Sequence, residues 1–351
     1  MKFLITGGAG FIGSAVVRHI ITDYEFEVMN IDKLTYAGSL DALAEVENNP
    51  LYKFEQVDIC DIELVEKVLY QYQPDYIMHL AAETHVDNSI NNPSNFINTN
   101  IIGTYQLLEA TRKYWQNIIL GDNKKINHFR FQHISTDEVF GDLEVNQPAF
   151  TEKSPYKPSS PYSASKASSD HLVNAWHRTF DLPIVVTNCS NNYGPFQHPE
   201  KLIPTVISRA LKGEPIPIYG SGEQIRDWLY VEDHADALVK VALNSEAGKH
   251  YNIGSEEEMT NIQLVRTICS LLDELHPKLP EGLKNYEDLI SFVNDRPGHD
   301  FRYAINSKKI KDELGWEPKN KFRSGIKATV SWYLNNQEWQ EKILSKANVQ
   351  D

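Results

Sequence analysis

Short apolar runs alternate along the chain with longer stretches in which apolar residues recur every three or four positions. The apolar runs cover residues 2–6, 26–32, 52–57, 76–80, 129–134 and 183–188. Helical spacing then appears over residues 14–21, 62–72, 96–115 and 163–180. Repeated strand–helix units form parallel sheets with right-handed crossovers. We therefore predict an α/β fold, a Rossmann-type doubly wound parallel sheet with a smaller C-terminal α/β lobe.

Two loops are expected in the first half of the chain, over residues 121–127 and 147–161. In the second half, periodicity predicts helices over residues 261–275 and 324–334. We interpret a group of large aromatic residues in this half as packing residues rather than as a stacking platform. They are Trp316, Trp332, Tyr333 and Trp339.

Glycines mark the first strand–helix unit. Strand 2–6 runs directly into Gly7, Gly10 and Gly13, and the next strand ends in Asp32. Gly7 permits a tight turn, Gly10 lets backbone N–H groups reach a pyrophosphate, and Gly13 allows close packing of helix on strand. An acid at this spacing binds ribose hydroxyls and repels a 2′-phosphate. The unit therefore predicts an NAD site rather than an NADP site.

Three polar residues follow the strand at 129–134, namely Thr136, Asp137 and Glu138. Ligands of open α/β sheets lie beyond the carboxyl ends of such strands. A hydroxyl and two carboxyls there suit a hydrogen-bond donor, a general acid and a general base, whereas a helix N-cap or polar turn is the alternative. Two adjacent carboxyls in a dry site do not both ionise easily, which favours one acid and one base. Because neighbours in a strand point to opposite faces, both reach one substrate only if the chain turns, as Gly141 favours.

Tyr162 and Lys166 lie one turn apart on the helix predicted over 163–180. A lysine on the same face stabilises a tyrosinate and lowers its pKa towards neutrality. An accidental surface pair is the alternative. Since the pair follows a dinucleotide fingerprint and Thr136, we interpret it as catalytic.

Charge and cysteine content narrow the classes of partner. The formal net charge of −14 at pH 7 argues against nucleic acid and anionic membranes, which need a basic surface. No apolar stretch approaches the roughly 18 residues of a spanning helix, and no signal-peptide core precedes Gly7. Cys60, Cys189 and Cys269 are too few and too scattered for a disulfide framework or a Cys-x-x-Cys metal site. We expect a cytoplasmic protein with reduced thiols and no metal.

Taken together, these markers resemble the extended short-chain dehydrogenase/reductase superfamily and, within it, the dTDP-glucose 4,6-dehydratase family. The likeness extends nearly end to end and includes residues 188–195, 200–204, 217–219, 224–233 and 295–300. Relatives that epimerise or reduce sugars usually carry small or hydroxyl residues in place of Asp137 and Glu138. Thr84 and Asn88 depart from the family's usual Glu-Ser-His-Val-Asp-Arg pattern, although position 84 keeps a hydroxyl.

The resemblance implies an NAD-dependent hydro-lyase that converts dTDP-glucose to dTDP-4-keto-6-deoxyglucose for deoxysugar (for example rhamnose) biosynthesis. Tyr162 would take the C4 hydroxyl proton while NAD takes the C4 hydride, and Thr136 would bind the C4 oxygen. Glu138 would then remove the C5 proton and a protonated Asp137 would donate to the leaving C6 hydroxyl, before hydride returns to C6. A dehydratase, epimerase or decarboxylase acting on another nucleotide sugar is the alternative. A non-catalytic NAD-binding regulator or scaffold is a third hypothesis.

Fingerprint and resemblance together imply the binding residues. The expected cofactor-binding residues are Gly7, Gly10, Phe11, Ile12, Gly13, Asp32, Lys33, Leu34, Thr35, Asp58, Ile59, Leu80, Ala81, Ala82, Thr99, Tyr162, Lys166 and Asn192. The expected substrate-binding residues are Thr84, Thr136, Asn191, Lys201, Leu202, Pro217, Tyr219, Arg226, Asn261, Arg296 and His299. Among them Lys201, Arg226 and Arg296 are candidate diphosphate partners, although surface salt bridges are the alternative for isolated basic residues.

The resemblance also implies an organisation. Residues 1–190, with returning segments near 225–255, are expected to form the NAD-binding Rossmann domain, and residues 191–351 mainly a substrate-binding lobe. The pair Asn191-Asn192 before Gly194 predicts a turn beside the site. Helices 96–115 and 163–180 are expected to pair across a homodimer axis, by analogy with the superfamily.

Overall fold

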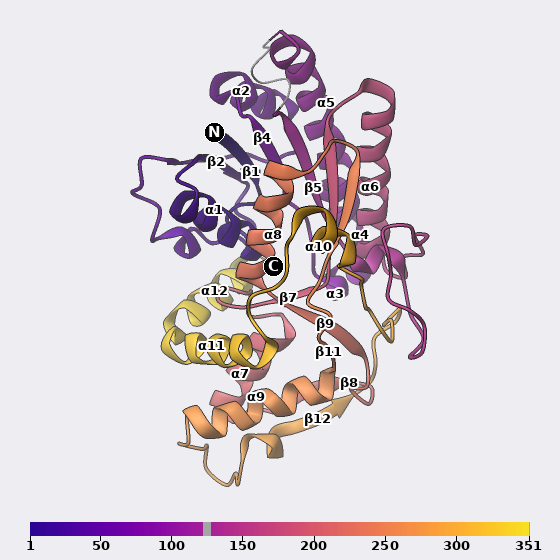
Figure 1. Ribbon diagram of the computed structural model, residues 1–351. Helices are drawn as coiled ribbons and strands as arrows, with labels where there is room; N and C mark the ends of the chain where they lie inside the picture. Colours follow the sequence, from indigo (N-terminus) through magenta and orange to yellow (C-terminus); the bar gives the residue numbers. More distant parts are fainter. Residues whose placement is uncertain (122–127, 351) are drawn as a thin grey trace.

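A computed structural model describes residues 1–121 and 128–350 (Figure 1). Its centre is a seven-stranded sheet in the order β10-β6-β5-β4-β1-β2-β3, with every neighbouring pair parallel. The strands are β1 (Lys2–Thr6), β2 (Glu27–Asp32), β3 (Tyr52–Gln56), β4 (Tyr76–His79), β5 (Arg130–Thr136), β6 (Ile184–Cys189) and β10 (Lys249–Ile253). The predicted doubly wound parallel sheet is confirmed. The loop expected over 121–127 lies almost wholly outside the described residues.

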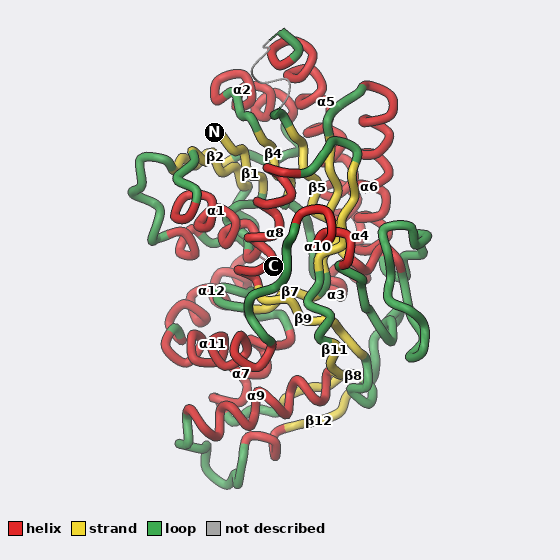
Figure 2. The backbone as a smooth tube through the Cα atoms, viewed as in Figure 1, coloured by secondary structure: helices red, strands yellow, loops and turns green. Residues whose placement is uncertain are grey.

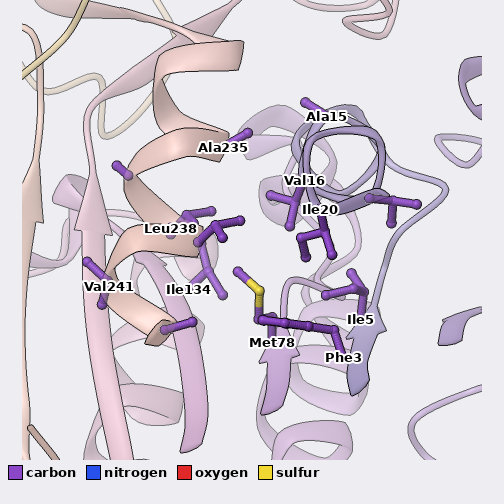
Figure 3. Packing of buried hydrophobic residues seen from close by; sticks show 14 of the residues in the cluster. Phe3, Ile5, Ala15, Val16, Ile20, Met78, Ile134, Ala235, Leu238 and Val241 are labelled. Carbon is purple, nitrogen blue, oxygen red and sulfur yellow. The ribbon is translucent and has the colours of Figure 1, made fainter. Parts of the chain in front are cut away.

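Helices cover both faces of this sheet, because its strands are apolar on both sides. The first face carries α1 (Phe11–Asp23), α8 (Val231–Asn244) and α10 (Lys308–Leu314). The second face carries α2 (Ile62–Tyr72), α5 (Thr104–Tyr114) and α6 (Pro161–Phe180). Along β1, Phe3 and Ile5 point to the first face and Leu4 to the second. Figure 3 shows Phe3 and Ile5 packed with Val16 of α1 and Leu238 of α8.

The long helix predicted over 96–115 is built from several pieces. After α4 (Pro93–Phe96), residues Ile97–Gly103 form a π-helical segment, α5 follows, and a second π-helical segment covers Trp115–Ile119. The short helix α3 (Val86–Asn91) was not predicted, because its six residues show no apolar periodicity.

The remaining strands form two small sheets, visible in the lower half of Figure 2. One contains β7 (Asn191–Tyr193), β9 (Ile225–Tyr230) and β11 (Glu258–Thr260), and the other contains β8 (Ile216–Tyr219) and β12 (Ile290–Val293). The turn predicted at Asn191-Asn192 is therefore wrong. Asn191 instead pairs in parallel with Trp228, because the edge of β9 supplies a partner that lies far away in sequence. The chain then returns to the large sheet through α8 and β10.

A third hydrophobic core lies among the helices of this region, which are α7 (Leu202–Lys212), α9 (Asn261–Leu275), α11 (Phe322–Asn335) and α12 (Gln337–Gln350). The predicted helix bounds at 261–275 are confirmed. Tyr333 is fully buried, and the rings of Trp332 and Trp339 pack against it and each other. Trp316 is also buried, but against the first face of the large sheet. Their interpretation as packing residues is confirmed.

Two further features complete the description. The loop between β5 and α6 docks on residues 300–305, where Phe150 N donates to Ala304 O over 2.9 Å and Asp142 Oδ1 accepts from Phe301 N over 2.7 Å. All three cysteines carry free thiols. Within the two described stretches of chain, no helix combines the length and apolarity needed to cross a bilayer.

Candidate active site

The glycine turn after β1 brings three segments into close contact. A Cβ on Gly7, which has φ of +73°, would lie 2.6 Å from the backbone of Ala81, and one on Gly13 would lie 2.1 Å from Gly7 O. The N-cap of helix α1 is Gly10, which has no side chain to cap the helix, and the first turn carries no acid. Its first N–H groups therefore point into open space at the positive end of the helix, which suits a diphosphate.

The acid at the end of β2 organises the next turn. Asp32 Oδ2 accepts from Ala9 N over 3.0 Å, and Asp32 Oδ1 accepts from Leu34 N over 2.8 Å. Leu34 adopts the left-handed φ of 58°, which is uncommon outside glycine. Burial raises the pKa of Asp32, and these two N–H bonds oppose that effect. The carboxyl is thus fixed between the glycine turn and the loop after β2, where the hydroxyls of an adenosine ribose would fit.

A cleft of about 1580 Å³, its open mouth included, runs from this turn along the carboxyl ends of the central strands. It is lined by most of the residues predicted for the cofactor and by all five predicted catalytic residues. These are Gly7, Gly10, Phe11, Ile12, Gly13, Asp32, Lys33, Thr35, Asp58, Ile59, Leu80, Ala81, Ala82, Thr99, Thr136, Asp137, Glu138, Tyr162, Lys166 and Asn192. Thr84, Asn191 and Lys201 from the substrate set line it too. The uncapped start of α1, the carboxyl of Asp32 and a cleft that runs along the sheet edge together fit a dinucleotide.

Thr136 ends β5, and the chain then turns into a short 3₁₀ segment, Asp137–Phe140. Thr136 Oγ1 donates to Asp137 Oδ1 over 3.3 Å and accepts from Glu138 N at the same distance. Gly141, with φ of +88°, closes the turn against Lys157 O, where a Cβ would come within 2.2 Å. The turn that the strand geometry required is present, so both carboxyls line one cleft.

The two carboxyls have different electrostatic surroundings. Burial, followed by the nearby charge of Glu138, raises the pKa of Asp137 well above its ordinary range, and its Oδ2 is buried with no hydrogen-bond partner among the described residues. Burial also raises the pKa of Glu138, but three cations oppose this, in the order Arg296, Arg226 and Lys201. Asp137 is therefore suited to hold a proton and Glu138 to give one up more readily, which fits an acid and a base respectively.

Tyr162 lies in the first turn of α6 and Lys166 in the second, and both face the cleft. The prediction that Lys166 lowers the pKa of Tyr162 is wrong for this structure. Burial, and then the charge of Glu138, raise that pKa well above its usual value. The Lys166 ammonium donates to the Ile134 carbonyl over 2.8 Å, and its charge is not among the main influences on the pKa of Tyr162.

Leu34, predicted for the cofactor, does not line this cleft. The remaining predicted substrate residues also lie outside its lining, namely Leu202, Pro217, Tyr219, Arg226, Asn261, Arg296 and His299. Asp87 of α3 joins two of them, since its carboxylate accepts from Arg296 Nη1 and from Tyr219 OH, each over 3.2 Å. The rings of Tyr219 and His299 also meet edge to face at 6.2 Å. These side chains form a second group beyond the acid pair.

Arg226 has a different environment from the one expected of a diphosphate partner. Its guanidinium donates to three backbone carbonyls, of Ile225, Asp300 and Phe301, at 2.7 to 3.3 Å, and lies 4.3 Å from the centre of the Tyr303 ring. The side chain is 5% exposed. Its charge acts on the acid pair, because it lowers the pKa of both carboxyls.

Comparison with known proteins agrees with this geometry. The family model described as GDP-mannose 4,6 dehydratase matches residues 4–329. The chain is 59% identical to the dTDP-glucose 4,6-dehydratase of Escherichia coli, covering 98% of this chain and 96% of that protein. It is 58% identical to that of Haemophilus influenzae, covering 96% and 98%. This chain belongs to the dTDP-glucose 4,6-dehydratase family.

Solved structures of the dTDP-glucose 4,6-dehydratase family share the fold throughout. The Bacillus anthracis dTDP-glucose 4,6-dehydratase in complex with NAD has a TM-score of 0.84 and 42% identity, covering 98% of this chain and 99% of that one. The Streptomyces venezuelae dTDP-glucose 4,6-dehydratase with NAD and TYD bound has a TM-score of 0.87 and 40% identity, covering 98% and 100%.

For this dTDP-glucose 4,6-dehydratase family member, sequence reasoning missed part of the cleft wall. The missed lining residues are Ile31, Ala37, Gly38, Val57, Glu83, Ile134, Ser135, Cys189, Ser190, Gln197, His198 and Glu200. Glu200 lies opposite the loop after β2, where Tyr36 OH donates to Glu200 Oε1 over 3.3 Å. Asn88, which departs from the family pattern, donates to the same Tyr36 hydroxyl over 3.3 Å. Nothing local in the sequence shows that these segments meet.

Proposed function

We propose that this chain catalyses the NAD-dependent dehydration of dTDP-glucose to dTDP-4-keto-6-deoxyglucose. The carrying observation is that the acid pair Asp137 and Glu138 faces the same cleft as Tyr162 and Lys166, beside a turn built for a dinucleotide. Oxidising an alcohol needs only Tyr162 and Lys166. Removing water from the neighbouring carbons needs an additional acid and base, and Asp137 and Glu138 supply them.

Each proton transfer of the reaction is assigned to one residue of this chain. When bound, NAD supplies the hydride acceptor at C4 and later the hydride donor at C6. Tyr162, as the phenolate, accepts the C4 hydroxyl proton, and the Thr136 hydroxyl binds the C4 oxygen. Glu138 removes the C5 proton, which the new ketone makes acidic, and protonated Asp137 donates to the leaving C6 hydroxyl. General acid–base help of this kind contributes about 10²–10⁴ in rate per group.

Cationic side chains near the acid pair support a diphosphate-containing substrate. Lys201 lines the cleft, and its ammonium donates to Thr84 O over 3.1 Å. Arg296 lies close enough to Glu138 to lower the pKa of that carboxyl. We propose that Lys201 and Arg296 bind the diphosphate, while Arg226 acts mainly on the acid pair. Asn191 Oδ1, buried and without a partner, is available for a sugar hydroxyl.

Mass spectrometry on the purified protein with dTDP-glucose deuterated at C4 tests the proposal. The expected result is the loss of one water with the deuterium recovered at C6. The Tyr162→Phe variant serves as the inactive control. An unchanged mass would contradict the dehydratase proposal, and chromatography would then separate an epimer from unreacted substrate. Repeating the assay with other nucleotide sugars would show whether another sugar is the substrate.

We also propose that residues 1–190 with the returning α8 and β10 bind the cofactor, and that the rest mainly binds substrate. A cytoplasmic location is proposed as well, which the three free thiols support. These assignments rest on the resemblance and on the sheet order.

The outer face of the π-helical segment and α5, beside the end of α6, supports a homodimer. Ile97, Ile102, Tyr105 and Phe180 expose 46%, 44%, 39% and 36% of their surface there. Contiguous exposed apolar groups mark protein interfaces. We propose that a second copy of this chain covers this face. Sedimentation of Ile102→Lys should give a monomer where the parent chain gives a dimer, and Val145→Lys, at another exposed apolar site, should leave the dimer intact.

A further inference from the structure

A buried carboxylate with no part in the proposed reaction lies one helical turn beyond Lys166. Asp170 of α6 is fully buried, and donors from three other segments surround it. Its Oδ1 lies 3.0 Å from His133 Nε2 on β5. Its Oδ2 accepts from Ser135 Oγ over 2.9 Å and from Tyr156 OH over 2.8 Å, with Asn188 Nδ2 at 3.5 Å. A carboxylate this well solvated by protein donors is stable as an ion.

Lys166 and Asp170 dock on adjacent positions of the same strand. The Lys166 ammonium donates to the Ile134 carbonyl, while Asp170 binds the residues on either side of it, His133 and Ser135. At i and i+4 on α6, the two side chains share one helix face. Both are buried, at 5% and 0% exposure. Two opposite charges are therefore enclosed together, with Lys166 lining the cleft and Asp170 buried behind it.

The other titratable groups around this pair are uncharged at neutral pH. Burial lowers the pKa of His79 on β4 and of His133 on β5, and lowers that of His250 on β10 to about 4. Burial likewise raises the pKa of the Cys189 thiol on β6 and of the Tyr156 phenol. Burial, and then the charge of Glu138, raise the pKa of the Tyr162 phenol on α6 itself.

Asp170 and Lys166 are the charged groups of this cluster. Burial favours the neutral form of both, but the hydrogen bonds from His133 and Tyr156 and the charge of Lys166 hold the pKa of Asp170 below its usual range. Burial lowers the pKa of Lys166, and Asp170 is the first group that opposes this. The carboxylate is thus the largest of the influences that favour the charged form of Lys166.

We propose that Asp170 is the buried counter-ion of Lys166, a positioning residue that keeps the ammonium charged and docked on the Ile134 carbonyl. Asp170 touches neither the cleft nor a ligand and acts only through Lys166. The inference rests on the proposed function only in taking Lys166 to be a catalytic residue. The charge relationship itself can be measured without substrate.

Carbon-13 magnetic resonance of the lysine ε-carbons, in labelled protein with NAD bound, reads the titration of Lys166 directly. The Lys166→Met variant identifies its signal. In Asp170→Asn the pKa of Lys166 should fall by about 1–3 units, the size typical of losing an adjacent opposite charge. Tyr156→Phe and Ser135→Ala remove one donor each but keep the carboxylate, so they should shift it much less. An unchanged Lys166 titration in folded Asp170→Asn would overturn the proposal.

A stability cycle keeps the proposal testable if Asp170→Asn alone does not fold. Lys166→Met leaves a buried, unpaired carboxylate, which is strongly destabilising. The double variant Lys166→Met/Asp170→Asn should therefore be more stable than Lys166→Met, and the deficit of Lys166→Met should shrink as the pH falls and Asp170 takes up a proton. If Asp170→Asn destabilises both backgrounds equally, the carboxylate is only a structural group. Either result is independent of whether dTDP-glucose is the substrate.

Discussion

Asp87 Oδ1 lies 3.2 Å from Arg296 Nη1 and thereby joins α3 to the loop that follows β12. The second oxygen of the same carboxylate accepts from Tyr219 OH, on β8. One acid from the segment after β4 therefore orients two side chains that the sequence assigns to the substrate. It does so next to the acid pair, since Arg296 acts on Glu138.

Replacing Asp87 with alanine should weaken nucleotide binding. Arg296 and Tyr219 would lose their shared partner and would have to be ordered by the ligand itself. Both partners of the ion pair are partly exposed, at 22% and 31%, so the loss should stay within about 1 kcal/mol, or up to about fivefold in Kd. Calorimetric titration with dTDP measures it, and Glu281→Ala, which removes an exposed acid on the loop after α9, is the control. Equal or tighter binding by Asp87→Ala would show that the contact does not prepare the site.

The acid pair should be separable from the oxidation step. Asp137→Asn and Glu138→Gln keep the size of each side chain but remove the transferable proton or the base. We expect C4 oxidation to survive, with elimination slowed by about 10²–10⁴-fold. A single-turnover assay should then show reduced cofactor accumulating by its absorbance without release of dehydrated product. Product formation at the parent rate by either variant would refute the role assigned to that carboxyl.

Tyr162→Phe should block the reaction earlier. The phenol oxygen is the only part of Tyr162 lost, so binding of the dinucleotide should persist while the C4 proton has no acceptor. No reduced cofactor should appear in the same single-turnover assay, in contrast to the acid-pair variants. Thr136→Val, which removes the hydroxyl near the same oxygen, should slow this step less severely. Rapid accumulation of reduced cofactor in Tyr162→Phe would assign the proton to another group.

Asp137 should lower the stability of the fold as the pH rises. Its folded pKa is raised, mainly by burial, above the ordinary value of 3.8. Below that pH the Asp137 carboxyl is protonated in both the folded and the unfolded state, so it does not change the free energy of unfolding with pH. Above it the unfolded carboxyl ionises while the buried one keeps its proton, so the free energy of unfolding falls by about 1.4 kcal/mol per pH unit until the folded pKa is reached.

Asp137→Asn should therefore unfold at a higher temperature than the parent chain at neutral pH, and the gap should shrink on acidification. Thermal unfolding across this range measures it. Glu246→Gln, at an exposed site, should change stability by no more than about 0.5 kcal/mol at any pH. A variant that is less stable than the parent at neutral pH would show that the carboxyl is ionised and satisfied in the fold.

The features that the sequence predicted well are local ones. The glycine turn, the strand ending in Asp32 and the helix carrying Tyr162 and Lys166 are each encoded by residues within one turn or one strand of each other. Periodicity reports such neighbours directly, because side chains repeat every two residues in a strand and every 3.6 in a helix. The acid pair was also readable, since its place depends only on where β5 ends.

The misjudged and missed features all depend on burial or on distant partners. The strand at Asn191 exists because β9 lies beside it, and Asp87, Tyr36 and Glu200 meet partners from other segments. Spacing showed that Tyr162 and Lys166 share a face, but not that the ammonium turns to the Ile134 carbonyl or that Asp170 lies behind it. The sequence by itself determined the fold and indicated the residues that we propose as the reacting groups. Tertiary packing alone decided their protonation, because charge depends on how completely the folded chain excludes water and on which ion it encloses alongside.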